Sequence, residues 1–153
     1  MRVNTKIRYG LRTMIEIANS KEPNGVLQKD IAINQNISLK YLDSIISSLK
    51  LKGIVSTSKG RGSGYKLTRS TSEITMYDIY TAFEPIEIIE CINNNSFCDN
   101  WQNCKAKSYW NEFKIDFVEL LSKRTLQHII EETSTICTNP THSDSPYFHP
   151  INP

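Results

Sequence analysis

Two short helical segments joined by a single turn residue most constrain what this chain can fold into. The first segment is predicted over Gln28–Gln35, and Asn36 supplies the turn because asparagine tolerates a left-handed backbone better than most residues. Ser38 is a good N-cap for a second helix, predicted over Leu39–Lys52 and ended by Gly53. The apolar stripe of this second helix is predicted to be Leu39, Leu42, Ile45, Ile46 and Leu49.

The segment after this helix pair has the pattern of a two-stranded hairpin. Residues 54–57 and 65–68 are predicted strands, and the glycine-rich tip Lys59–Gly64 lies between them. A helix pair followed by a hairpin is typical of a winged helix-turn-helix. A nucleotide-binding loop is rejected for the tip, because a strand follows it and no helix N-terminus would hold a phosphate.

Further helices are predicted where apolar residues recur at helical spacing. They cover Asn4–Asn19, Thr75–Phe83, Lys105–Ser122 and a last segment that contains Leu126, Ile129 and Ile130. The aromatic stripe on the helix over Lys105–Ser122 is interpreted as a core and dimer seam rather than as a cofactor site.

The charge of the chain is divided unevenly between its two halves. Residues 1–73 hold 13 Lys and Arg against 5 Asp and Glu, whereas residues 74–153 hold 5 against 11. A basic half of this kind indicates an acidic partner, most often nucleic acid, and the alternative is a chance fluctuation of surface charge. No apolar run exceeds three residues, so no membrane-spanning helix is predicted, and we expect a cytoplasmic protein.

The helix over Leu39–Lys52 is predicted to enter the major groove of double-stranded DNA, because the second helix of a helix-turn-helix does so. The polar side chains on its predicted solvent face include Ser38, Lys40, Tyr41, Asp43, Ser44, Ser47 and Ser48. In the wing tip, Lys59 and Arg61 are predicted to reach phosphates or the minor groove. The alternative is a small helical core with a hairpin that binds nothing. No nucleophile–base pair or phosphate loop indicates an enzyme.

Three of the four cysteines are spaced Cys91-x6-Cys98-x5-Cys104, which is not the paired C-x-x-C spacing of a zinc ribbon. Three thiolates in one loop can hold three corners of an iron–sulfur cluster and leave one position for another ligand. The spacing alone leaves open three independent thiols or a pair that oxidises to a disulfide.

At this point the sequence resembles a family, the winged-helix iron–sulfur regulators of the IscR and NsrR type (the Rrf-two family). The resemblance runs from Met1 to about Glu132. It rests on Met1–Val3, Ile37–Leu42, the wing Gly60–Tyr65, the three cysteines, Trp110 and Thr125–Gln127.

The resemblance implies a homodimer joined through the long helix after the cysteine loop. Such a protein would respond to loss or oxidation of its cluster or to attack by nitric oxide. The response would be a change in the transcription of its target genes. By position, Cys91, Cys98 and Cys104 would bind a [2Fe-2S] or [4Fe-4S] cluster. The residues that would face DNA are Ser38, Lys40, Tyr41, Lys59 and Arg61.

The fourth ligand of such a cluster is not identifiable. Lys107 stands where the IscR type has a histidine, and Arg8 and Arg12 stand where other branches take a ligand from the partner's first helix. Glu90, Asp99, Cys137 or a small molecule are the remaining candidates. These departures leave room for a thiol–disulfide switch, for zinc bound by three cysteines, and for a loop that senses nothing.

The sequence therefore predicts a mostly helical protein with a small hairpin wing and a long C-terminal dimerisation helix. Residues 1–70 would form a winged helix-turn-helix DNA-binding domain, and residues 71–137 the cysteine loop and dimerisation helices. Residues 138–153, with four prolines, would be a flexible tail. The predicted function is a dimeric transcriptional regulator that responds to iron–sulfur cluster status, and the alternative is a thiol-sensing or cluster-free repressor.

Overall fold

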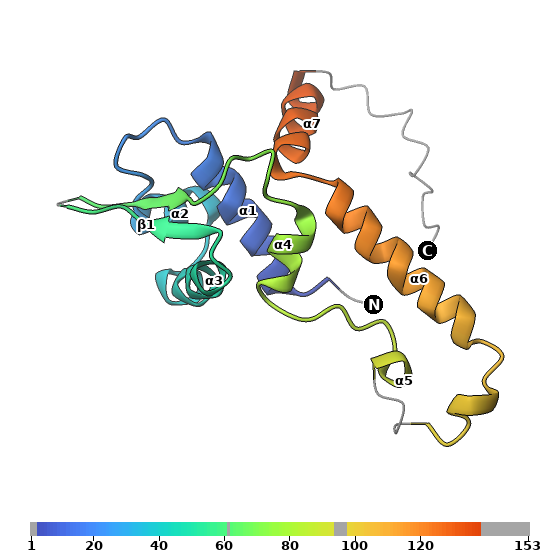
Figure 1. Ribbon diagram of the computed structural model, residues 1–153. Helices are drawn as coiled ribbons and strands as arrows, with labels where there is room; N and C mark the ends of the chain where they lie inside the picture. The colour runs from blue at the N-terminus through green and yellow to red at the C-terminus, as the bar shows by residue number, and fades with distance from the viewer. Residues whose placement is uncertain (1–2, 61, 94–97, 139–153) are drawn as a thin grey trace, which may run out of the picture.

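The computed structural model in Figure 1 describes residues 3–60, 62–93 and 98–138, with the side chains of all of these except 93 and 133–138. Its elements are α1 (Thr5–Asn19), α2 (Gln28–Gln35), α3 (Leu39–Leu51), β1 (Val55–Thr57), β2 (Tyr65–Leu67), α4 (Met76–Thr81), α5 (Glu90–Asn93), the 3₁₀ helix η2 (Trp101–Asn103), α6 (Lys107–Lys123) and α7 (Leu126–Thr138). The predicted tail lies outside the described residues from residue 139 onward.

The helix pair α2–α3 forms where the sequence predicted it. Asn36 follows α2 in the left-handed region with a φ of 52°, and its backbone N–H closes the helix end. The hydroxyl of Ser38 caps α3 by accepting a hydrogen bond from the Tyr41 N–H. Four residues of the predicted stripe are buried, but Leu39 is 53% exposed, so its assignment to the core was wrong.

The predicted hairpin is present as the antiparallel pair β1–β2, with Val55 opposite Leu67 and Thr57 opposite Tyr65. Val26, in the connection before α2, forms an isolated bridge with Tyr65 and so extends the hairpin by one short segment. Figure 1 shows the hairpin projecting from the helices at one end of the molecule. A mostly helical chain with this hairpin confirms the predicted fold class.

The core lies between α1, the α2–α3 pair and α4, and it also receives the start of α7. Leu126 is fully buried, and its N–H donates to the carbonyl of Ile74 at 2.7 Å. Thr75 and Asp78 form a capping box at the start of α4, and Asp78 also pairs with Arg69 at 3.3 Å. These contacts attach the C-terminal helices to the winged helix through backbone as well as side chains.

The long helix α6 packs against α4 but has no buried residue of its own. Its inner side includes Phe117, whose ring meets that of Tyr80 edge-on at 6.0 Å between centroids. In Figure 1, α6 runs away from the winged helix, and the segment with α5 and η2 lies at its far end. Much of the apolar surface of this helix therefore remains uncovered within one chain.

Thr13 in the middle of α1 is the basis of a stability prediction. Its side chain is fully buried, and its Oγ1 has no hydrogen-bond partner among the described residues. Thr13→Val keeps the shape and removes the unpaired hydroxyl, so we expect the free energy of unfolding to rise by about 1 kcal/mol. Urea denaturation measures this change, with the exposed Thr5→Val as the matched control. Equal or lower stability of Thr13→Val would contradict the prediction.

Candidate nucleic-acid interface and cysteine loop

The outer face of α3 carries two of the residues predicted to meet DNA. Ser38 at the helix start and Lys40 in its first turn are both exposed. Asp43, one turn further on the same face, is also exposed, and its carboxylate accepts a hydrogen bond from Gln28 Nε2 at 2.6 Å. The face presents one hydroxyl and one cation near its N-terminus and an acidic group behind them.

Tyr41 and Ser44 are placed differently from the expected solvent face. Tyr41 is half-buried, and its ring meets the ring of Tyr9 on α1 edge-on at 5.9 Å. Ser44 is also half-buried, and its Oγ donates to the Tyr41 carbonyl at 2.8 Å. Both residues remain predicted DNA contacts, but Tyr41 additionally joins α3 to α1.

A small polar network connects the wing with the helix pair. Gln28, the first residue of α2, donates to Asp43 of α3 and accepts from the Tyr65 hydroxyl of β2 at 3.4 Å. Partial burial, together with the nearby Asp43 carboxylate, raises the pKa of Tyr65, so it keeps its proton as a donor. No local sequence signal marks Gln28, since its role depends on two partners 15 and 37 residues away.

The wing tip presents Lys59 as an exposed cation. Ser58 braces the base of the tip, because its N–H donates to the Gly64 carbonyl at 2.9 Å and the Gly64 N–H donates back to Ser58 Oγ at 3.0 Å. Gly60 and Gly62 have φ values of 106° and 74°, a region that favours glycine. Arg61, the second predicted cation, lies outside the described residues.

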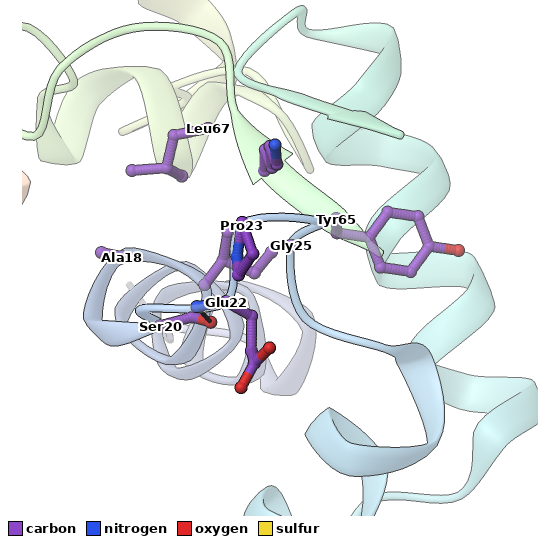
Figure 2. A pocket seen from close by; sticks show the side chains of 9 residues that line it. Ala18, Ser20, Glu22, Pro23, Gly25, Tyr65 and Leu67 are labelled. Atoms are coloured by element: carbon purple, nitrogen blue, oxygen red, sulfur yellow. Dashed lines mark hydrogen bonds between the residues drawn. The ribbon is translucent and has the colours of Figure 1, made fainter. Parts of the chain in front are cut away.

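At the base of the wing, an open hollow of about 370 Å³ lies between the end of α1, the turn after it and β2. Figure 2 shows its walls, with Ala18 and Ser20 on one side and Tyr65 and Leu67 of β2 on the other. The wing and the α1–α2 connection are thus in direct contact here.

The three loop cysteines are free and partly exposed. Cys91 lies in α5, Cys98 just before η2, and Cys104 at the end of η2. Among the described residues, no three His, Cys, Asp or Glu side chains are close enough together to hold a metal ion. The structure therefore does not bring these thiols together with one another or with Glu90 or Asp99 as a ligand set, and the side chain of Cys137 lies outside the described residues.

Lys107, which stands where a fourth ligand was sought, begins α6 beside this loop. Its ammonium lies 3.8 Å from the centroid of the Trp101 ring, a cation–π contact. The contact occupies the Lys107 side chain with an aromatic ring of the loop itself.

As to membranes, the described helices are all too short or too polar to cross a bilayer.

Comparison with known proteins identifies relatives that match this chain over most of its length. The sequence model of Rrf2, described as an iron-dependent transcriptional regulator, matches residues 3–132. Protein rrf2 of Nitratidesulfovibrio vulgaris strain Hildenborough is 30% identical over 148 residues, which cover 96% of this chain and 98% of that protein.

Two solved structures are similar along most of their length. CymR, the global cysteine regulator of B. subtilis, has a TM-score of 0.67 at 28% identity and covers 86% of this chain and 98% of its own. IscR of T. potens has a TM-score of 0.68 at 25% identity, and the match covers 96% of this chain and 95% of the T. potens chain. These similarities are to transcriptional regulators rather than enzymes. With the family model spanning most of the chain, the protein belongs to the Rrf2 family of transcriptional regulators.

Proposed function

We propose that this chain is a homodimeric transcriptional regulator that binds double-stranded DNA through α3 and the wing. The observation that carries the proposal is the exposed first turn of α3, with Ser38 and Lys40, on the same winged helix as the cation Lys59. The uneven charge of the sequence supports it, because the basic half contains the whole winged helix. Residues 1–70 would act as the DNA-binding domain and residues 71–137 as the dimerisation and sensing part.

In this proposal, Ser38, Lys40, Tyr41 and Ser44 meet the major groove or its edges, as the second helix of a helix-turn-helix does. The wing cations Lys59 and Arg61 bind phosphates or the minor groove, which fixes orientation more than sequence. Asp43 would lie close to the groove, and its hydrogen bond to Gln28 holds its carboxylate toward α2.

Removing the wing cation Lys59 is expected to weaken binding to every duplex equally. For Lys59→Gln, the slope of log Kobs against log salt should fall in magnitude by about 0.9, the value for one lost phosphate contact. Fluorescence anisotropy from low to moderate salt measures the slope. Lys21→Gln, an exposed lysine in the α1–α2 connection, is the matched control. An unchanged slope for Lys59→Gln would remove Lys59 from the proposed interface.

The second part of the proposal is that the cysteine loop reads the signal. An iron–sulfur cluster is the hypothesis from the sequence, and the description of the matched family as iron-dependent supports it. The described residues do not fit such a cluster as they are arranged, because the three thiols form no metal-holding group and Lys107 is stacked on Trp101.

The exposure of the loop thiols favours a second candidate, a thiol switch. Cys91, Cys98 and Cys104 are free and partly exposed, so an oxidant can reach them. Two of these thiols would be oxidised to one disulfide while hydrogen peroxide is reduced to two molecules of water. The two thiol protons are taken up by that water. The similarity to CymR, named the global cysteine regulator, supports regulation linked to sulfur chemistry.

One preparation separates these two candidates. The chain is purified without oxygen, its iron and sulfide contents and visible spectrum are recorded, and its affinity for promoter fragments is measured before and after peroxide. The cluster would be supported if the wild type contains iron and is coloured and if Cys98→Ala loses both. A metal-free protein whose affinity changes with a disulfide would support the switch. Equal affinity of the wild type and of a variant with Cys91, Cys98 and Cys104 all changed to Ser, in every state, would contradict both candidates.

A further inference from the structure

An apolar groove lies on the helix-turn-helix, where the outer side of α2 meets the start of α3. It is open to solvent and has a volume of about 270 Å³. Its lining is apolar except for one lysine and consists of Lys29, Ala32, Ile33, Ile37 and Leu39. Ile33 is 74% exposed and Leu39 is 53% exposed. Large apolar side chains that share one exposed patch indicate a surface that binds something.

The groove adjoins the helix start that is proposed to meet DNA. Leu39 is the first residue of α3 and stands between Ser38 and Lys40, which are both exposed. Gln28 of α2 holds this helix start in place, because its Nε2 lies 3.5 Å from the Leu39 carbonyl oxygen and donates to Asp43 at 2.6 Å. Leu39 is therefore an apolar side chain at an ordered position among polar residues that are proposed to read the major groove.

The charge and the size of the groove favour DNA as its occupant. Lys29 is exposed, and no salt bridge joins it to a carboxylate within the described part of the chain. An apolar surface with a cation at its rim matches the edge of a base that lies beside a phosphate. The open volume also falls below the range of about 300–1,000 Å³ that is usual for small-molecule pockets.

The major groove offers one methyl group to such a surface, the C5 methyl of thymine. We propose that the groove receives this methyl group, with Leu39 in contact with it and Lys29 on a neighbouring phosphate. The proposal rests on the proposed function and adds a sequence preference to it, namely for thymine where the first turn of α3 enters each half-site. Phosphate contacts by themselves carry no such preference.

The methyl group can be removed without changing the base pairing, by replacing thymine with deoxyuridine. Duplexes that the full chain binds are selected from a random pool of about 30 base pairs, which is long enough for two half-sites. Each thymine of a selected duplex is then replaced singly, and fluorescence anisotropy gives the Kd. We expect one replacement in each half-site to weaken binding about 4-fold, the value for one buried methyl group.

The variant Leu39→Ala tests whether the groove is the cause of this difference. Thymine and deoxyuridine duplexes should bind equally well to Leu39→Ala, because the side chain that contacts the methyl group is gone. Leu51→Ala is the matched control, since Leu51 is a leucine at the other end of α3 and is 92% exposed. It should keep the difference of about 4-fold. Lys29→Gln should also keep it, while the magnitude of the salt slope falls by about 0.9.

The outcomes distinguish this inference from the proposed function. If the wild type binds no duplex above background, the proposed function fails and the inference fails with it. If the wild type binds but no deoxyuridine replacement weakens binding, or if Leu39→Ala keeps the difference, the inference alone is overturned. If Leu39→Ala binds too weakly to measure, Ile33→Ala decides, and it should narrow the difference. Altered sedimentation of Leu39→Ala with an unchanged difference would assign the groove to a protein contact and overturn the inference.

Discussion

Gly25→Ala is expected to lower the free energy of unfolding by about 3 kcal/mol, the combined cost of a strained backbone and an overpacked contact. Gly25 has a φ of 80°, and a Cβ added to it would lie 2.6 Å from the carbonyl oxygen of Tyr65. That oxygen belongs to the backbone of β2 and accepts from the Val26 N–H at 3.1 Å, so it cannot move without breaking the bridge at the wing base. Figure 2 shows Gly25 beside this strand.

The chain contains a matched control for this effect. Gly53 has nearly the same backbone, with a φ of 77°, but no atom lies within 4 Å of the position its Cβ would take. Gly53→Ala should therefore cost only the backbone strain, about 1 kcal/mol. Urea denaturation of both variants measures the difference, which isolates the steric contact. Equal destabilisation of the two variants would show that β2 and the α1–α2 connection are not packed this closely.

Leu120→Asp is expected to weaken the proposed homodimer by at least about 100-fold. Tyr109, Phe113 and Leu120 are exposed and lie at spacings of four and seven residues, so they form one apolar stripe along α6. A second copy of this helix is the proposed cover of the stripe, because a two-fold interface is self-complementary. An aspartate in such a seam would bury an unpaired carboxylate in both protomers at once, which costs several kcal/mol.

Ile115 is the matched control for this experiment. It is 63% exposed, compared with 56% for Leu120, but it lies two residues from Phe113 and so about 200° round the helix. Ile115→Asp should leave the dimer intact. Sedimentation equilibrium gives the dissociation constants, and promoter binding should fall together with dimer formation. Similar dissociation constants for Leu120→Asp and the wild type would show that the stripe is not the dimer seam.

Most helix and strand positions were predictable because their signals are local. The predicted α2 boundaries, the end of α1 and the start of α3 agree with the structure, and no other predicted end differs by more than two residues. The turn at Asn36 and the cap at Ser38 are as expected. A cap or a left-handed turn is decided by residues within about four positions, which a sequence shows directly. The exposure of Leu39 was not predictable in this way, since periodicity gives one face of a helix but not how much of that face its neighbours cover.

The candidate site was predictable only in part. The residue types of α3 and the wing indicate contact with DNA, but the half-buried setting of Tyr41 depends on Tyr9, which lies 32 positions earlier in the chain. Arg8 and Arg12 entered the sequence analysis only as positions that cannot ligate a cluster. That both guanidinium groups lie over the Tyr9 ring and that Arg12 is bound to Gln35 is visible only in the structure.

By itself, the sequence determined the helix-turn-helix, the wing, the basic front half and the presence of three cysteines in one segment, because propensity, capping and charge are properties of neighbouring residues. Only the tertiary structure decided which side chains meet across the chain. It turned Arg12 toward the end of α2, left a stripe of α6 uncovered, and kept the three thiols from forming a metal-holding group among the described residues. Such contacts join segments far apart in the chain, and they depend on packing that no local pattern encodes.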